Sequence, residues 1–396
     1  MKGRELMKYN FDEVIDRKNT DSMKWSASYL ERHFGSADCV PLWVADMDFR
    51  TAQPVIDAVT ERAGHGIYGY ALPGDEFYEA VIKWQKRRNG WEVKKEWIVF
   101  SPGVVPALWH IVRTFCSPGE KVILQSPVYY PFYKVIEDNG CQVINNRLIN
   151  NGGRYEMNFD ELEKQAADGS VRMMILCSPH NPVGRVWTKE ELRRVSEICF
   201  ANDVLLVSDE IHSDLVFRPN VHTPAASLSE ELMMNTITCM APSKTFNLAG
   251  VQVSDVIVPD RRLRRRLAGS LKSAGVMPNV FGLAAQTAAY NEGEEWLEQL
   301  LEYLAGNLDF MENFITSELP EVKFRRPEGT YLAWLDFSGY GFTTEELQNR
   351  MKNKAGVALD DGYIFGDGGE PCQRINFACP RSVLIKAMER LRKGVE

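Results

Sequence analysis

Short apolar segments recur along this chain, and each is separated from the next by a loop or by a stretch long enough for a helix. Apolar runs of this length, bounded by helical or turn segments, are typical of strands that are buried on both faces of a parallel sheet. The alternation predicts an α/β fold with a mostly parallel sheet covered by helices on both faces. The expected strands are residues 97–100, 121–124, 172–177, 204–208, 236–240 and 253–258.

Helices are expected wherever apolar residues recur with helical spacing. The pattern predicts helices over 75–88 and 104–115, and Pro106 falls in the first turn of the latter, where proline is tolerated. From 294 to about 319, apolar side chains recur at steps of three and four residues, which indicates one long amphipathic helix. The basic run 261–266 follows a predicted strand and is expected to form a solvent-facing side of a helix.

A separate α+β unit is expected after the long helix. Its predicted strands are 323–334, 356–359 and 374–377. We therefore divide the chain into a large domain, residues 50–290, and a small domain built from both chain ends, residues 1–49 and 291–396.

The chain's charge and cysteine content narrow its function classes. The 396 residues include 46 Lys and Arg against 54 Asp and Glu, a net charge of −8, which argues against binding to nucleic acid or anionic lipid. No apolar stretch approaches the roughly 18 residues needed to span a bilayer, and residues 1–19 contain no apolar signal-peptide core. The 8 cysteines include no C-x-x-C pair, as is typical of reduced thiols. We therefore expect a cytoplasmic protein.

Polar residues follow three of the predicted strands at the point where each strand ends. Asn181 lies in the proline-stiffened loop 178–184, Asp209 directly follows an apolar strand, and Lys244 lies on a turn of small and hydroxyl residues at 241–247. Because ligands of open α/β sheets bind at the carboxyl ends of the strands, Asn181, Asp209 and Lys244 should converge. A buried Asp–Lys ion pair with a neighbouring Asn is the purely structural alternative.

These residue types match the requirements of pyridoxal 5′-phosphate (PLP). PLP needs a lysine for its Schiff base and a carboxylate at its pyridine nitrogen. Backbone N–H groups at the helix start in 101–106 could bind the phosphate, and Ser243 adds a hydroxyl. Tyr129, after another strand end, could cover the ring.

A metal site is the other interpretation of the polar residues around Asp209. Asp209, His212, Asp214 and His222 are all potential ligands. No His-Glu-x-x-His or paired-cysteine pattern accompanies them, so we predict no metal site.

In the order of its motifs the chain resembles the class I and II aminotransferases of fold type I, over about residues 9–392. Within that superfamily it is most similar to the MalY/PatB carbon–sulfur lyases, the cystathionine β-lyase branch. The resemblance implies a large domain with a mostly parallel seven-stranded sheet and a smaller α+β domain. The matching motifs are 43–49, 127–132, 178–184, 209–212, 241–247 and 374–377.

The resemblance implies a cofactor role for several residues of these motifs. Lys244 would bind PLP covalently and move the substrate α-proton, and Asp209 would pair with the pyridine nitrogen. Asn181 would reach the ring hydroxyl, Tyr129 would stack on the ring, and His212 would contact the cofactor.

The resemblance also implies contacts to the phosphate and the substrate. Val104, Val105 and Ser243 would hold the phosphate, and Tyr68 would reach it from the other subunit of a homodimer, with Tyr70 as the alternative. Arg374, whose planar guanidinium suits the α-carboxylate, would bind the substrate. Independently of the resemblance, we expect Tyr130, with small and aromatic residues near Trp43 and Phe365, to shape the pocket for the group on the substrate sulfur.

Two departures from the aminotransferase pattern favour elimination over transamination. His212 stands where transaminases usually have a tyrosine, and Gln252 stands where they usually have a phosphate-binding arginine. We therefore expect α,β-elimination of L-cystathionine or another L-cysteine S-conjugate to a thiol, ammonia and pyruvate. Two alternatives stay open: an aminotransferase that uses a 2-oxo acid, and a regulatory protein that binds a transcription factor, as some lyases of this branch do.

Overall fold

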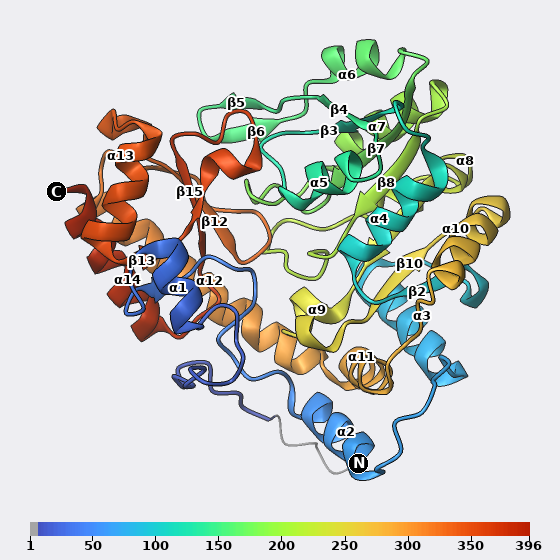
Figure 1. Cartoon of the computed structure of the whole chain (residues 1–396), viewed down its shortest axis with the longest axis horizontal. Coiled ribbons are helices and arrows are strands. Elements are labelled where there is room, and N and C mark those ends of the chain that lie inside the picture. Colours follow the sequence, from blue (N-terminus) through green and yellow to red (C-terminus); the bar gives the residue numbers. More distant parts are fainter. Residues whose placement is uncertain (1–6) are drawn as a thin grey trace.

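A seven-stranded sheet forms the centre of the structure, a computed structural model that describes residues 7–396 (Figure 1). The strands follow the order β2-β10-β9-β8-β7-β3-β4. β10 runs antiparallel to β2 and β9, and the other pairs are parallel, which confirms the mostly parallel sheet that the apolar runs predict. The strands are β2 (Ile98–Ser101), β3 (Lys121–Leu124), β4 (Gln142–Asn145), β7 (Val171–Cys177), β8 (Leu205–Asp209), β9 (Thr236–Met240) and β10 (Ser254–Ile257).

The edge strand β4 is not among the predicted strands. Its side chains are partly exposed, so the segment contains no continuous apolar run. The central strands β7, β8 and β9 are buried at nearly every position. An apolar run reports burial on both faces of a strand and therefore identifies the centre of a sheet better than its edge.

Helices cover both faces of this sheet. Alternate residues of one strand point to opposite faces, so Val122 and Leu124 pack in one cluster while Ile123 packs in another. The first cluster includes helices α4 (Val104–Phe115), α5 (Pro131–Glu137) and α10 (Arg261–Ser273). The second includes α6 (Phe159–Ala166), α7 (Lys189–Ala201) and α8 (Glu230–Met234).

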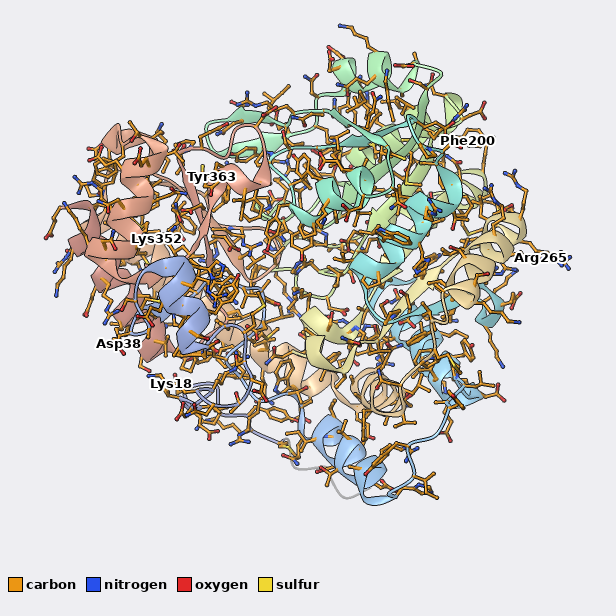
Figure 2. All side chains as sticks on the ribbon, in the orientation of Figure 1. Lys18, Asp38, Phe200, Arg265, Lys352 and Tyr363 are labelled. Atoms are coloured by element: carbon orange, nitrogen blue, oxygen red, sulfur yellow. The ribbon has the colours of Figure 1, made fainter. Side chains whose placement is uncertain are left out.

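The basic run at 261–266 begins α10. Leu263 and Leu267 on this helix are buried against the sheet, whereas Arg261 and Arg262 are exposed. Figure 2 shows Arg265 projecting from the edge of the molecule. The prediction of a solvent-facing basic helix surface is confirmed.

The remaining helices of the first part of the chain lie beside this sheet. α2 (Gln53–Gly64) and α3 (Asp75–Asn89) both pack against α11 (Val280–Glu292) in the largest apolar cluster. α12 (Glu294–Glu318), the predicted long helix, contributes its apolar stripe to the same cluster. This cluster therefore joins the helices of the large sheet to the C-terminal part of the chain.

A four-stranded antiparallel sheet with the order β11-β12-β15-β14 lies in the C-terminal part. The segment around residue 40 joins this part because β1 (Val40–Pro41) pairs in parallel with β13 (Val357–Ala358). The sheet strands are β11 (Lys323–Phe324), β12 (Leu332–Asp336), β14 (Asp360–Asp361) and β15 (Cys372–Asn376). The helices of this part are α1 (Ala27–Phe34), α13 (Thr344–Asn349) and α14 (Arg381–Val395).

The prediction of one strand over 323–334 is wrong. β11 and β12 are separated by a loop in which Gly329 forms an isolated bridge with Val216, near the end of the large sheet. Pro327 in this loop has no backbone N–H for a sheet ladder, which favours the interruption. The loop thus connects the small sheet to the segment that follows β8.

A small hairpin and a short helix complete the elements that bear on the site. The hairpin pairs β5 (Ile149–Asn151) with β6 (Arg154–Glu156), and α9 (Pro242–Thr245) follows β9. None of the helices found within residues 7–396 is long and apolar enough to cross a bilayer. The division of the chain at residues 50 and 290 stays a prediction.

Candidate functional site

The ends of three neighbouring strands open on one cavity of about 190 Å³. β7, β8 and the α9 turn after β9 bring Asn181, Asp209 and Lys244 to its wall, as the strand-end rule predicts. The cavity is also lined by Ala45, Gly103, Val104, Val105, Tyr129, Cys177, His212, Ser243 and Gln252. Nearly all the residues that the sequence singles out for a cofactor therefore line one cavity.

Asp209 is held at the end of β8 with its carboxylate in the cavity wall. The backbone N–H of Ile211 donates to Oδ1 of Asp209 at 3.2 Å. Burial raises the pKa of Asp209 to about 7, and the neighbouring Glu210 adds to the shift while Lys244 opposes it. A cationic ligand group opposite this carboxylate would lower that pKa and keep Asp209 ionised.

Lys244 lies in the single turn of α9, which begins at Pro242. Its Nζ donates to the backbone carbonyl of Ala45 at 2.5 Å. Burial lowers the pKa of Lys244 to about 8, and the negative charge of Asp46 partly opposes that shift. A substantial fraction of this amine is therefore neutral, and hence nucleophilic, just above neutral pH.

The start of α4 forms another part of the cavity wall. Gly103 precedes the helix, and Val104 and Val105 are its first residues. The first N–H groups of a helix have no partner within it, and together with the helix dipole they attract an anion. Ser243 and Gln252 line the same cavity, so a phosphate here would meet backbone donors and polar side chains but no arginine of the cavity lining.

Arg374 on β15 is buried and contacts several parts of the chain. Its guanidinium donates to Oδ1 of Asn181 and to the carbonyl of Trp43, each at 3.0 Å, and forms an ion pair with Asp360 on the adjacent β14. It also lies 4.9 Å from the ring centre of Phe365. Arg374 is therefore paired with Asp360 inside the small sheet, and its hydrogen bond to Asn181 connects it to the cavity.

Two buried nitrogens in this region have no hydrogen-bond partner within the described residues. They are Nδ1 of His212, which lines the cavity, and Nε of Arg374. Burial, together with the charges of Lys244 and Arg374, lowers the pKa of His212 well below its ordinary value, so the imidazole is neutral. Unpaired buried polar atoms are costly, so these nitrogens indicate that a polar ligand completes the site.

The predicted aromatic residues lie at different distances from the cavity. Tyr129 lines it, and burial raises the pKa of its hydroxyl, which stays protonated. Tyr130 lies outside the lining, with its ring edge-on to Phe365. Tyr68 is exposed on the loop after α2, and its hydroxyl donates to the carbonyl of Ala63 at 2.6 Å. Within one chain, Tyr68 and Tyr130 are therefore not brought to the cavity.

Sequence reasoning missed three contributors to the site. They are the carbonyl of Ala45, the hydroxyl of Tyr331, and the carboxylate of Asp360. Ala45 belongs to the motif 43–49. Asp360 directly follows the predicted strand 356–359, so a carboxylate at the end of that strand could be seen in the sequence. In the sequence, Tyr331 is one aromatic residue directly before a strand, and no local pattern indicates which group its hydroxyl contacts.

The chain matches the family model for aminotransferase class I and II over residues 37–391. Cystathionine beta-lyase PatB of Bacillus subtilis (strain 168) is 44% identical, with 98% of this chain and 100% of the relative covered. Protein MalY of Escherichia coli (strain K12) is 32% identical over 97% of this chain and 98% of the relative.

Solved structures are similar over the same span. Cystalysin from Treponema denticola, which contains a PLP cofactor, superimposes with a TM-score of 0.95 at 38% identity, covering 98% of this chain and 99% of the other. The PLP-bound C-S lyase from Staphylococcus hominis has a TM-score of 0.90 at 35% identity, covering 98% of both chains.

Proposed function

Because this chain belongs to the class I and II aminotransferase family, we propose that it is a PLP-dependent carbon–sulfur β-lyase of the cystathionine β-lyase type. The observation that carries the proposal is the cavity that joins Lys244, Asp209 and the start of α4. The 44% identity to a cystathionine beta-lyase over nearly the whole chain supports the same reaction.

The residues of the cavity fit the three chemical parts of PLP. Lys244 would bind the cofactor covalently, and Asp209 would face the ring nitrogen. The phosphate would lie against the N–H groups of Val104 and Val105 and the hydroxyl of Ser243. Asn181, His212 and Tyr129 would contact the ring. When bound, PLP supplies an electron-withdrawing ring that stabilises negative charge on the substrate α-carbon.

The chain's own residues would then bind the substrate and move its proton. Arg374 would bind the α-carboxylate and exchange part of its pairing with Asp360 for that contact. Lys244, once its amine is free, would take the α-proton. The bond between the β-carbon and sulfur breaks, and the sulfur leaves as a thiolate. The remaining three-carbon fragment is hydrolysed to pyruvate and ammonia.

Elimination rather than transamination is supported by two residues in the cavity. His212 is neutral and buried, and Gln252, at a position where aminotransferases usually have an arginine, lines the cavity. Both residues line the cavity, so they are placed to affect the reaction that follows removal of the α-proton.

We also propose a cytoplasmic homodimer in which Tyr68 of one subunit reaches the phosphate of the other. The exposed apolar residues Ile67 and Leu72 beside Tyr68 support a covered surface at this loop. The 8 free cysteines support a reducing compartment.

The test is a single assay of purified protein with PLP and L-cystathionine, without any 2-oxo acid. We expect pyruvate and free thiol to appear in equal, sustained amounts. Lys244→Ala should fold but lose turnover by about 10³-fold or more, since it lacks both the covalent anchor and the base. Turnover that stops after one equivalent and resumes on addition of a 2-oxo acid would identify an aminotransferase instead, and full activity of Lys244→Ala would exclude the assigned role.

A further inference from the structure

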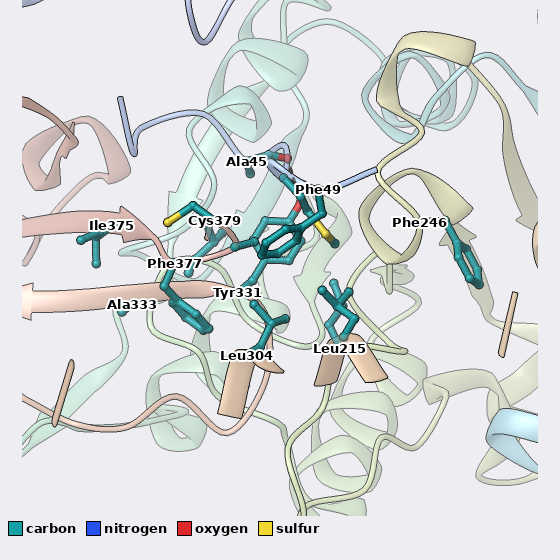
Figure 3. Close-up of a cluster of buried hydrophobic side chains, with 14 of the residues drawn as sticks. Ala45, Phe49, Leu215, Phe246, Leu304, Tyr331, Ala333, Ile375, Phe377 and Cys379 are labelled. Carbon is teal, nitrogen blue, oxygen red and sulfur yellow. Dashed lines mark hydrogen bonds between the residues drawn. The ribbon is translucent and has the colours of Figure 1, made fainter. Parts of the chain in front are cut away.

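The backbone carbonyl of Ala45 accepts two hydrogen bonds from distant parts of the chain. One comes from Nζ of Lys244 at 2.5 Å, and the other comes from the hydroxyl of Tyr331 at 2.9 Å. Tyr331 lies directly before β12 in the C-terminal part, and Lys244 lies beside the large sheet. Figure 3 shows Tyr331 in the buried cluster that also contains Ala45 and Leu215.

The segment that carries this carbonyl is fixed on both sides. The side-chain amide of Asn376 donates to the carbonyls of Val44 and Asp46 at 2.8 and 2.7 Å. Asn247, three residues after Lys244, accepts from the N–H of Met47 at 2.9 Å. Arg17 forms an ion pair with Asp46 at 2.6 Å. These contacts fix the residues on either side of Ala45, and the direction of the Ala45 carbonyl itself decides where the amine of Lys244 points.

Tyr331 has the burial and the orientation to set that direction. Its side chain is fully buried, and its ring lies edge-on to His212 with ring centres 5.8 Å apart. Burial raises the pKa of the Tyr331 hydroxyl well above its ordinary value, so the group remains a donor throughout the working pH range. The same ring thus contacts one cavity residue and supports the acceptor of another.

We propose that Tyr331 is a positioning residue for Lys244: its hydroxyl holds the Ala45 carbonyl, on which the free amine of Lys244 rests. The inference deepens the proposed function, because Lys244 must hold this position whenever its amine is free to take the α-proton. A free amine on a four-carbon side chain has many rotamers, and a fixed acceptor selects the one that faces the cavity.

Tyr331→Phe isolates this role. The substitution keeps the ring, and Ala45 retains the Lys244 donor, so no buried carbonyl is left unpaired. Tyr290→Phe is the matched control: Tyr290 is a buried tyrosine of the same apolar cluster and does not line the cavity. Both variants should melt at similar temperatures.

Two measurements test the proposal. The first is the rate at which the PLP-free protein captures added PLP, followed by visible absorbance; Tyr331→Phe should slow capture about 10-fold or more, since the amine is less well directed. The second is the kinetics with α-deuterated L-cystathionine; kcat should fall about 10–100-fold with KM nearly unchanged, and the isotope effect should rise because proton transfer becomes slower.

Each outcome decides the proposal. The proposal is overturned if Tyr331→Phe has the same PLP capture rate and the same isotope effect as the wild type. It is also overturned if Tyr290→Phe changes both quantities as much as Tyr331→Phe does. If the wild type has no lyase activity, the capture rate alone tests Tyr331, so a failure of the proposed function is distinguished from a failure of this inference.

Discussion

At the scale of single residues, burial rather than ion pairing dominates the pKa of three acids, Asp209, Asp255 and Asp360. The pKa of Asp360 is raised to about 6 by burial, although Arg374 opposes the shift, and Asp209 and Asp255 reach about 7. Asp209 faces the cavity, so a cationic ligand group can offset its burial. Asp255 on β10 does not line the cavity, and its carboxylate accepts hydrogen bonds from a neutral amide, Gln286.

Burial of Asp255 should therefore make the free energy of unfolding depend on pH. In the unfolded chain its carboxyl titrates near pH 4, whereas in the fold its pKa is about 7. Its favourable contribution is complete below about pH 4 and is lost as the pH rises through 7, because the folded state must then bury a charge. Asp255→Asn keeps the size and removes the charge. The variant should gain about 2–3 kcal/mol relative to the wild type between pH 5 and pH 8.5.

The measurement is urea unfolding of the PLP-free protein at both pH values. Asp57 offers the control, because it also accepts a hydrogen bond from a glutamine, Gln53 at 2.7 Å, but is exposed. Asp57→Asn should follow the wild type at both pH values. Parallel behaviour of Asp255→Asn and the wild type would show that Asp255 is not buried as a neutral acid.

At the scale of elements, the turn after β7 contacts the loop that precedes β12 of the small sheet. Gly184 in this turn has a φ of 70°, and its carbonyl accepts from the N–H groups of Glu328 and Gly329 at 2.8 and 3.1 Å. Arg185, the next residue, pairs with Glu328 at 2.9 Å. The turn that presents Asn181 is thus connected to the loop that leads to Tyr331.

Gly184→Ala tests this close approach. A Cβ at this position would lie 2.4 Å from Cβ of Pro327, and the backbone is left-handed. The two effects together should cost about 2–5 kcal/mol of unfolding free energy. Gly90→Ala is the control, since Gly90 has a φ of 62° but open space around it; it should cost only about 1 kcal/mol. Equal losses in urea unfolding would contradict the close contact.

Elements were predictable from sequence to the extent that their pattern is local. The helix at 104–115 and the buried strands follow directly from apolar spacing. The loop between β11 and β12 has one local signal, Pro327, which the predicted strand 323–334 overlooks, but its pairing partner Val216 is more than a hundred residues away and no local pattern indicates it. The role of Tyr331 was not predicted either, because its hydroxyl donates to the carbonyl of Ala45, which lies 286 positions away in the sequence. Residues at strand ends, such as Asp209, can be predicted despite their separation in sequence, because the carboxyl ends of parallel strands lie at the same edge of the sheet.

At the scale of the whole molecule, the cavity is built from three parts of the chain. The segment around Ala45 contributes a carbonyl, the large sheet contributes Asp209 and Lys244, and the small sheet contributes Arg374 through Asn181. Such a site depends on the relative position of the two sheets. A shift of one sheet against the other would move Arg374 relative to Lys244, and so would change the distance between the proposed substrate-binding group and the proposed base.

The loop between α2 and α3 exposes several apolar side chains. Ile67, Tyr70 and Leu72 are 67%, 96% and 82% exposed in the single chain. Apolar side chains gathered on one loop indicate a surface that another molecule covers. We expect this molecule to be a second copy of the chain, with Tyr68 between the two cavities.

Sedimentation equilibrium of the PLP-loaded protein tests this expectation. The wild type should have twice the chain mass of 45.0 kDa, and the double substitution Ile67→Asp with Leu72→Asp should have the mass of one chain, because two buried charges would oppose association. Val221→Asp, at a residue that is 76% exposed elsewhere, should remain a dimer. The monomeric variant should also release PLP more readily, since it loses the contact from Tyr68 of the second copy. A monomeric wild type, or a double variant that stays dimeric and retains PLP, would place the interface elsewhere and leave Tyr68 without a role at the phosphate.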